Sequence, residues 1–319
     1  MVIINENLLI KHIVQKTKKG NMDNISRTKF YERFYFQHPE ILWALLAATV
    51  SRNAGWYMCD LESKWFKTLL DRDVRRTAFF VYERSNWLIF HDAYPQLLLY
   101  HYSKMHNRPL FHLLPYFNVS RFMMKEWQHF WKTKDEKRLL YSLIINEQNL
   151  IQSPVISNPF YQKKVFHTLF FRLQEFFHFG VVIFPACDGT LYGTRVDHFT
   201  RVDGRIDTGK KLASILFDQA IYGKIIDFVQ RTEHSGSRFD YEQYSFKKKR
   251  DTPFLRLTYP VVKHYPLKGK RWDEKKRVKK KWYKTPELTE EVDLTRWYRK
   301  KRIEIELMAV WKEWKDLNE

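Results

Sequence analysis

The sequence predicts a mainly α-helical protein with one compact multi-helix core, and three observations support this. Apolar residues recur at intervals of three and four along most of the chain, which is the period of an amphipathic helix. Aromatic residues make up 17% of the 319 residues, which indicates large rings packed in an interior. Only 10 glycines are present, and β-barrels and β-sandwiches need more of them for their tight turns.

Residues that favour helix starts divide the first 180 residues into successive helices. Side-chain oxygens of Asn, Ser and Asp accept hydrogen bonds from free N–H groups of a first helical turn, and proline is tolerated there. We expect Gly55 just past the end of the second helix, and we expect Asp92 with Pro95 to begin a new helix. The expected starts are Asn24 or Ser26, Pro39, Asp60, Asp71, Asp92, Ser120, Asp135 and Pro159.

The pattern changes after Gly180. Residues 181–185 are short and β-branched, which predicts one strand, followed by a turn at Asp188-Gly189. We expect a helix from Asp207 or Thr208 and a terminal amphipathic helix from about Asp293. The apolar stripe of that last helix should dock on the core; it consists of Ile303, Leu307, Val310, Trp311 and Trp314. The domains predicted are a helical core (1–240) and a basic, partly extended segment plus the docked C-terminal helix (241–319).

Basic residues are concentrated near the C-terminus. The formal net charge is +20, and residues 241–302 contain 21 Lys and Arg but 8 Asp and Glu. Such asymmetry is typical of a surface that meets phosphate-rich partners, although a basic solvated surface also keeps a protein soluble. Aromatic residues between the lysines are suited to stack on single-stranded bases. The candidate nucleic-acid-binding residues are Lys247, Lys248, Lys249, Arg250, Lys279, Lys280 and Lys281, with Trp272, Trp282 and Tyr283 as stacking residues.

Several functional classes find little support in the sequence. The two cysteines, Cys59 and Cys187, give no disulfide framework, so we expect a cytoplasmic protein. The first residues carry no basic region, long apolar run or small-residue cleavage site, so we expect no signal peptide, and the longest apolar run is too short to span a membrane. Residues 204–211 approach a P-loop but have Lys211 where magnesium needs a hydroxyl ligand. We predict no cofactor and no metal.

Two other motifs are incomplete: one lacks an essential residue, and the other is present in only one copy. Residues 186–190 imitate the aspartate-nucleophile motif of phosphatases, but Ala186 stands at the nucleophile position, so a plain strand and turn is favoured. Glu175 and His178 have the spacing of two metal ligands on one helical face. A di-metal bundle needs that pair on two helices, and only one copy is present.

Three apolar stretches carry polar residues that a plain core would exclude. The stretches are 41–47, which runs into Ser51, 86–90, which begins at Asn86, and 139–145, which continues to Glu147. A carboxylate on an apolar stripe is either paired structurally or held for acid–base chemistry. The candidate catalytic residues are Glu147, Asp92 and His91, and the candidate ligand-binding partners nearby are Arg52, Asn53 and Gln96.

A short polar motif, His234-Ser235-Gly236-Ser237-Arg238, follows directly on a helix. Hydroxyl residues around a glycine, between two cationic side chains, are able to bind a phosphate or carboxylate. The motif therefore predicts an anion site of His234, Ser235, Ser237 and Arg238. The structural alternative is a glycine-centred helix cap in which Arg238 pairs with Asp240 or Glu242.

Seven segments together resemble the YppC-like family of Bacillus-type bacteria, a domain of unknown function. The resemblance covers about residues 25–245 and implies a complete, single-family bacterial protein, but no activity, cofactor or catalytic residue. The segments are 26–28, 39–44, 51–56, 86–90, 92–97, 144–148 and 234–238.

Three functional hypotheses follow from these patterns. The first is a cytoplasmic protein that binds nucleic acid or another polyanion through the basic C-terminal region. The alternative is an enzyme or small-ligand binder with a buried polar pocket formed by Arg52, Asn53, Asp92 and Glu147. In the third, the internal polar residues only stabilise the fold and the basic region docks a partner. Convergence of the polar residues on an open pocket would favour the second hypothesis. Oligomeric state is left open.

Overall fold

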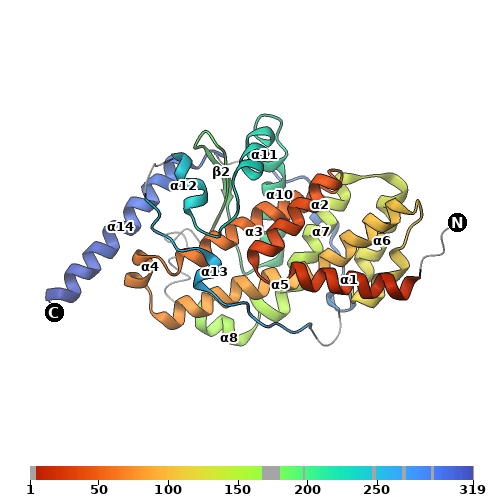
Figure 1. Ribbon diagram of the computed structural model, residues 1–319, viewed down its shortest axis with the longest axis horizontal. Coiled ribbons are helices and arrows are strands. Elements are labelled where there is room, and N and C mark those ends of the chain that lie inside the picture. Colours follow the sequence, from red (N-terminus) through yellow and green to blue (C-terminus); the bar gives the residue numbers. More distant parts are fainter. Residues whose placement is uncertain are drawn as a thin grey trace.

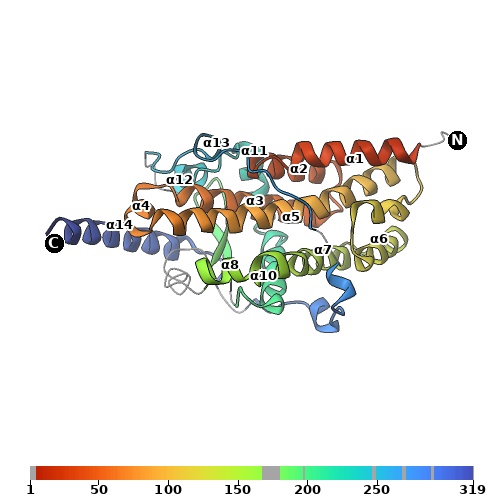
Figure 2. The same ribbon diagram turned by 90° about the horizontal axis from the view of Figure 1, so that it is seen from below.

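The computed structural model describes residues 5–166, 180–196, 198–245, 249–267, 271–288 and 291–318. Within these ranges the protein is mainly α-helical, as predicted, with a single two-stranded sheet. Figures 1 and 2 show an elongated molecule in which α3 and α5 run along the long axis and the two termini lie at opposite ends. Most of the helix expected from Pro159 lies outside the described residues, and so do Glu175 and His178.

The helical core is built mostly from the first half of the chain. Its helices pack around α3, 16 of whose 19 residues are buried. A large interior of aromatic and aliphatic side chains joins α2, α3, α5, α6 and α7. The helices are α1 (Glu6–Gly20), α2 (Asn24–Gln37), α3 (Leu42–Asp60), α4 (Lys64–Leu69), α5 (Arg72–Met105), α6 (Arg121–Thr133), α7 (Glu136–Ile151) and α8 (Pro159–Tyr161).

Two predicted helix starts are confirmed by their caps. Ser120 and Asp135 accept hydrogen bonds from the first turns of α6 and α7. In contrast, Asp92 and Pro95 start no helix, because both lie inside the 34-residue α5. A helix that is buried along this much of its length is stabilised by packing, which outweighs the hydrogen bond that Pro95 cannot make.

Gly55 lies inside α3, so the expectation that it follows the end of a helix is wrong. A Cβ atom at this position would come within 2.4 Å of the Asn24 side chain and 2.8 Å of the His234 ring. The glycine therefore permits these two side chains to pack against the backbone of α3. Close approach, and not helix termination, explains its place in the sequence.

A β-hairpin covers one side of the core. The predicted strand β1 (Val181–Pro185) pairs antiparallel with β2 (Leu191–Arg195), and the turn at Asp188-Gly189 joins them, with Gly189 at φ +84°. The P-loop-like residues form part of α10 (Val202–Leu216), which begins earlier than expected. Their helical backbone excludes the phosphate-binding loop. The later helices are α11 (Tyr222–Arg231), α12 (Phe239–Ser245), α13 (Leu255–Thr258) and α14 (Thr295–Asn318).

The basic C-terminal region contacts the core through its aromatic residues. Trp282 is buried and donates a hydrogen bond to Asp203. Trp272 donates to Asn146, and the Tyr283 hydroxyl contacts Ser142. These three rings hold the segment on α7 and α10, so they are not the exposed stacking surface that the sequence predicted.

Helix α14 projects from the end of the molecule that carries the C-terminus (Figures 1 and 2). It contacts α4 and β2. The apolar stripe expected to dock on the core is exposed instead, because the helix packs through a different face, which includes Tyr298, Ile305 and Ala309. None of the helices in the described ranges has both the length and the hydrophobicity that crossing a bilayer requires.

Candidate functional site

The three apolar stretches meet at a pocket in the middle of the molecule, which we call the central cavity. Its volume is about 160 Å³, and most of its surface is apolar. Stretch 41–47 and its continuation reach it through Trp43, Ala47 and Ser51, the second stretch through Asn86, and the third through Glu147. The remaining lining residues are Tyr31, Leu46, Val50, Ile89, Gln148, Val182, Val196, Phe199, Arg205, Thr208, Gly209 and Leu212.

Glu147 is the carboxyl group of the central cavity. One carboxyl oxygen accepts a hydrogen bond from the Trp43 indole at 3.0 Å, and the other accepts from the Gln148 amide at 3.0 Å. Burial raises the pKa of Glu147 to about 7, although both hydrogen bonds act in the opposite direction. A carboxyl with this pKa exchanges its proton near neutral pH, and no described cation forms a salt bridge with it.

Tyr31 is a second polar group at the central cavity, and sequence analysis did not single it out. Its side chain is buried, and its hydroxyl has no hydrogen-bond partner among the described residues. Burial raises the pKa of this phenol well above its usual value, and the nearby Glu147 charge adds to the effect. A buried hydroxyl without a partner is costly, so a ligand that supplies one would be stabilised here.

Arg205 closes one side of the central cavity, and it too was missed. Its guanidinium donates to oxygen atoms of Phe199, Gln148 and Gln152 at 2.6–2.9 Å, and none of these acceptors is a carboxylate. Burial lowers its pKa to about 10. Gly209 is the residue near Arg205 that could have been noticed in the sequence, as a glycine inside an expected helix. A Cβ atom at Gly209 would lie 2.8 Å from Ile144, so the glycine allows α10 to pack closely on α7.

Arg52 and Asn53 do not line the central cavity. Arg52 pairs with Glu32 at 2.7 Å and donates to the carbonyl of Thr232 at 2.8 Å. Asn53 donates to the carbonyl of Ile183 on β1 at 3.0 Å. Because neighbouring residues of a helix point about 100° apart, Ser51, Arg52 and Asn53 face three different neighbours. The polar pocket of Arg52, Asn53, Asp92 and Glu147 expected from the sequence is therefore not formed.

Asp92 and Gln96 belong to a closed network between α5, α6 and α7. Asp92 accepts hydrogen bonds from Gln96 at 2.7 Å and from Asn146 at 2.6 Å, and Trp127 donates to Gln96. Burial raises the pKa of Asp92 to about 7 despite these bonds. With its partners all inside the core, this network stabilises the packing of three helices.

His91 lies on the other side of α5, at a groove of about 560 Å³ between α1, α5 and residues 261–266. Its ring stacks on Trp87 at 4.8 Å. Burial lowers its pKa, and the charge of Arg84 lowers it further, so the ring is neutral at pH 7. None of the five residues expected as partners of Glu147 (Arg52, Asn53, His91, Asp92 and Gln96) is among its described hydrogen-bond partners, which are Trp43 and Gln148.

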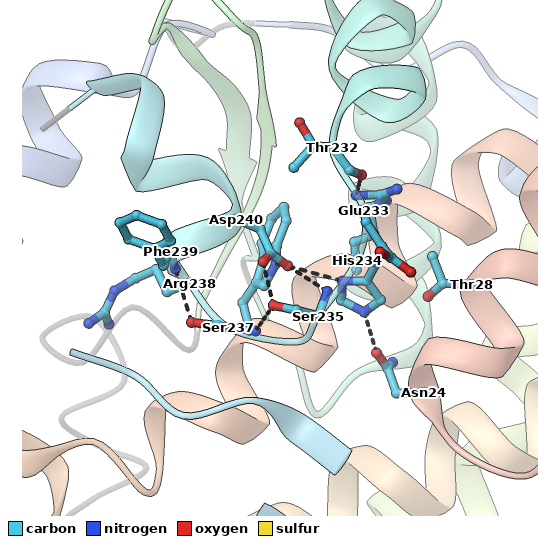
Figure 3. A network of polar contacts seen from close by, with 12 residues as sticks. Asn24, Thr28, Thr232, Glu233, His234, Ser235, Ser237, Arg238, Phe239 and Asp240 are labelled. Carbon is cyan, nitrogen blue, oxygen red and sulfur yellow. Dashed lines mark hydrogen bonds and ion pairs between the residues drawn. The ribbon is translucent and has the colours of Figure 1, made fainter. Parts of the chain in front are cut away.

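His234 and Ser235 form the network shown in Figure 3. His234 lies between Asn24, 2.7 Å from Nε2, and Asp240, 3.6 Å from Nδ1. Burial lowers the pKa of His234 more than Asp240 raises it, so the imidazole is neutral at pH 7. The backbone N–H of Ser235 donates to Asp240 at 2.9 Å, and the Ser235 hydroxyl donates to the same carboxylate. Ser235 therefore satisfies the Asp240 carboxylate, whereas His234 Nδ1 lies beyond hydrogen-bond distance of any described partner.

Ser237 and Arg238 point away from that network into the protein. The Ser237 hydroxyl contacts Thr252. The Arg238 guanidinium lies 2.8 Å from Asp60, 3.1 Å from Glu242 and 3.4 Å from Asp251. Three carboxylates around one buried guanidinium leave no place for an added anion. The prediction that His234, Ser235, Ser237 and Arg238 form one anion site is therefore wrong. The alternative pairing of Arg238 with Glu242 is present, and the pairing with Asp240 is not.

An open pocket of about 480 Å³ nevertheless lies next to His234 and Ser235, and we call it the basic pocket. Four cationic side chains from separate segments line it, Lys29, Arg231, Arg250 and Arg256, and the first, second and fourth of these pair with Glu233, Asp227 and Asp23. Arg250 packs against the rings of Phe239 and Phe254, and its charge has no described acidic partner. The adjacent Lys249 is exposed, whereas Lys247 and Lys248 lie outside the described residues.

The charge of the second predicted group of lysines, residues 279–281, is partly neutralised. Lys279 and Lys281 both pair with Asp203, while Lys280 is exposed and forms no described ion pair. The parts of the chain that the structure describes contain no cluster of three or more His, Cys, Asp or Glu residues able to hold a metal ion.

Comparison with known proteins relates this chain to others without a known activity. A family model described as a protein of unknown function (DUF2515) matches residues 19–299. An uncharacterized protein of Bacillus subtilis (strain 168), YppC, is 46% identical over 307 residues, which are 96% of each of the two chains. No solved structure matches this chain.

Replacing Arg238 should destabilise the protein strongly. Arg238→Met leaves the buried Asp60 without its described counter-ion, whereas Glu242 keeps Arg302, and breaking a buried pair costs about 3–5 kcal/mol. We expect this loss in the free energy of unfolding measured with urea. Arg250→Met, which removes an exposed guanidinium, is the matched control and should change stability little. Equal effects of the two substitutions would contradict the buried network.

The pH dependence of stability should change when Glu147 is replaced by Gln. The raised pKa means that the folded state holds this proton more tightly than the unfolded state. Stability from this group is therefore full below about pH 4.5 and is lost as the pH rises towards 7. Glu147→Gln should gain about 1–3 kcal/mol over the wild type between pH 5 and pH 8. Urea unfolding at several pH values measures this.

The exposed Glu287→Gln is the control for that experiment and should follow the wild-type pH profile. Parallel profiles for Glu147→Gln and wild type would show that Glu147 ionises normally. A large loss of stability in Glu147→Gln at every pH would instead identify it as a structural carboxylate.

Proposed function

The chain belongs to the DUF2515 family of proteins of unknown function, and we propose that it binds a small ligand in the central cavity. The observation that carries the proposal is that Glu147 and Tyr31, whose hydroxyl has no described partner, both line one pocket with mostly apolar walls. Mostly apolar walls with a few convergent polar groups are typical of ligand sites. The raised pKa of Glu147 supports a binding or proton-accepting role.

The size and chemistry of the central cavity limit the ligand. A volume of about 160 Å³ suits a body of about one aromatic ring, since a dry cavity of about 150 Å³ holds benzene. The Glu147 carboxylate has only neutral donors as described partners, so a ligand amine would supply its missing counter-ion. We therefore propose that the ligand is a small apolar amine. The enzyme alternative is then limited to a reaction in which Glu147 accepts or donates a proton.

Small aromatic probes test this proposal. Benzylamine should bind better than toluene, which lacks a donor, and better than benzoate, whose charge Glu147 repels. Calorimetry and ligand-observed NMR measure the binding. Ala47→Leu, which fills part of the cavity, should abolish binding of benzylamine and of toluene, whereas Glu147→Gln should weaken only benzylamine. Absence of binding by every probe, or binding that Ala47→Leu leaves unchanged, would refute the proposal.

A second candidate function is binding of a polyanion at the basic pocket and the lysines near it. Of the four cations that line it, Arg250 has no described acidic partner, and the exposed Lys249 precedes it in the chain. A nucleic acid is the partner that such a surface suits, through its phosphates and not through base stacking, because Trp272 and Trp282 are turned inward. We also propose a cytoplasmic location, which the two free thiols, Cys59 and Cys187, support.

Binding of heparin and of single-stranded oligonucleotides should fall steeply with salt if this second function is present. Lys249→Gln with Arg250→Gln should reduce the slope of log affinity against log salt by about 0.7 for each lost phosphate contact. The control is Lys125→Gln with Lys132→Gln, which removes the same charge from the exposed face of α6 and should alter the slope less. No binding at low salt would exclude the polyanion function.

A further inference from the structure

The groove that His91 lines, between α1, α5 and residues 261–266, is a further concave site, and we call it the α1–α5 groove. Its volume of about 560 Å³ lies in the range of about 300–1,000 Å³ that is typical of ligand pockets. Four large apolar side chains that are 46% to 69% exposed gather at it from separate segments: Val14, Met22, Tyr116 and Val261. Single exposed apolar residues are ordinary, but a group of them in one hollow indicates a binding site.

Aromatic rings form part of the wall of the α1–α5 groove. Trp87 lies on α5, and Tyr116 and Phe117 lie in the short helix that precedes α6. The Trp87 ring is held by His91 and His264, whose ring centroids lie 4.8 Å and 5.3 Å away. Neither Tyr116 nor Phe117 packs against another described aromatic ring. A planar ligand would therefore supply the stacked or edge-to-face contact that these two rings lack.

The fully charged side chains of the α1–α5 groove are both basic. Lys18 and Lys263 are exposed, and neither forms an ion pair with a described residue. None of the described lining residues is an aspartate or a glutamate. The lowered pKa of His91 keeps its ring neutral at pH 7, and a neutral imidazole still has one N–H to donate. Two unpaired ammonium groups and a further donor favour an anionic group on the ligand.

The acidic residue in contact with this groove does not cancel that preference. Glu83 lies 3.4 Å from the His264 ring, but it is buried and pairs with the buried Arg27. Its charge is therefore already compensated inside the protein, whereas the charges of Lys18 and Lys263 are not.

The chemistry of the α1–α5 groove differs from that of the other two pockets. The central cavity is smaller and contains the Glu147 carboxyl, and the basic pocket is lined by Glu233 and Asp240 as well as by cations. We propose that the α1–α5 groove binds an aromatic carboxylate, whose rings pack on Tyr116 and Phe117 and whose charge the two groove lysines neutralise. This site is independent of the amine site in the central cavity.

Three naphthalene probes of similar shape and different charge test this proposal. 2-Naphthoate should bind more tightly than the neutral 2-naphthamide, and the cationic 2-(aminomethyl)naphthalene should bind least. Calorimetry on the full chain measures the binding. Added salt should weaken 2-naphthoate and leave 2-naphthamide unchanged, because salt screens exposed charges. Two fused rings exceed the central cavity, where a volume of about 160 Å³ holds one ring, so these probes do not report on that cavity.

Removing the two groove lysines should weaken 2-naphthoate selectively. Lys18→Gln with Lys263→Gln should raise its Kd about tenfold and leave the Kd of 2-naphthamide unchanged. The matched control is Lys11→Gln with Lys19→Gln, which removes the same charge from exposed positions of α1 outside the groove. Equal weakening by the two double variants would show a general effect of net charge and overturn the proposal.

Removing one wall ring should weaken both of these probes. Tyr116→Ala should raise the Kd of 2-naphthoate and of 2-naphthamide by about threefold to tenfold, because it removes an aromatic contact. Phe36→Ala is the control: this ring is 47% exposed but lies on α2, so neither Kd should change. All of these substitutions alter exposed side chains, so an unchanged melting temperature should confirm folding.

Binding elsewhere, or by another occupant, gives different results. Ala47→Leu in the central cavity and Arg250→Gln in the basic pocket should leave 2-naphthoate binding intact, and its loss in either variant would overturn the proposal. Absence of 2-naphthoate binding by wild type would overturn it as well. A dimer in light scattering that Tyr116→Ala abolishes, without 2-naphthoate binding, would assign the groove to a second copy of the chain instead.

Discussion

The burial of α3 on nearly all of its sides is the constraint on which the rest of the structure depends. A helix surrounded by protein has to place each polar side chain against a partner, because a buried unpaired group costs free energy. The described partners of Arg52, Asn53 and Asp60 come from three different parts of the chain: Glu32 in α2, Ile183 in β1 and Arg238 before α12. These pairings fix the positions of α2, the hairpin and the 234–242 region around one helix.

At the central cavity, the pairing of buried polar groups leaves one group without a described partner. Trp43 of α3 donates to Glu147 of α7, yet the Tyr31 hydroxyl beside them has no described partner. In the network of α5, α6 and α7, by contrast, the Asp92 carboxylate is paired by Gln96 and Asn146. The contrast between a closed network and an open one is what separates a structural carboxyl from a candidate functional one. Both have a raised pKa, so the pKa alone does not distinguish them.

The surface of the molecule divides its charge and its apolar area between different places. The aromatic residues of the basic region are used to attach that region to α7 and α10, which leaves its lysines exposed. The C-terminal helix does the reverse, since it attaches through Ile305 and Ala309 and leaves Trp311 and Trp314 in solvent. The proposed ligand site in the core, the basic pocket and the exposed face of α14 are therefore separate surfaces.

The sequence by itself determined the helical class, the caps at Ser120 and Asp135, strand β1 and the family. These follow from local periodicity and from short-range hydrogen bonds, which neighbouring residues specify. It also identified Glu147, because a carboxylate on an apolar stripe is visible from spacing alone. The partners of each polar residue were decided only by the tertiary structure. Rotation of about 100° per residue sends Ser51, Arg52 and Asn53 to different neighbours, and Tyr31 and Arg205 reach the central cavity only through helix packing. For the same reason, the apolar stripe of α14 could be recognised from the sequence, while its exposure depended on which face of the helix met α4.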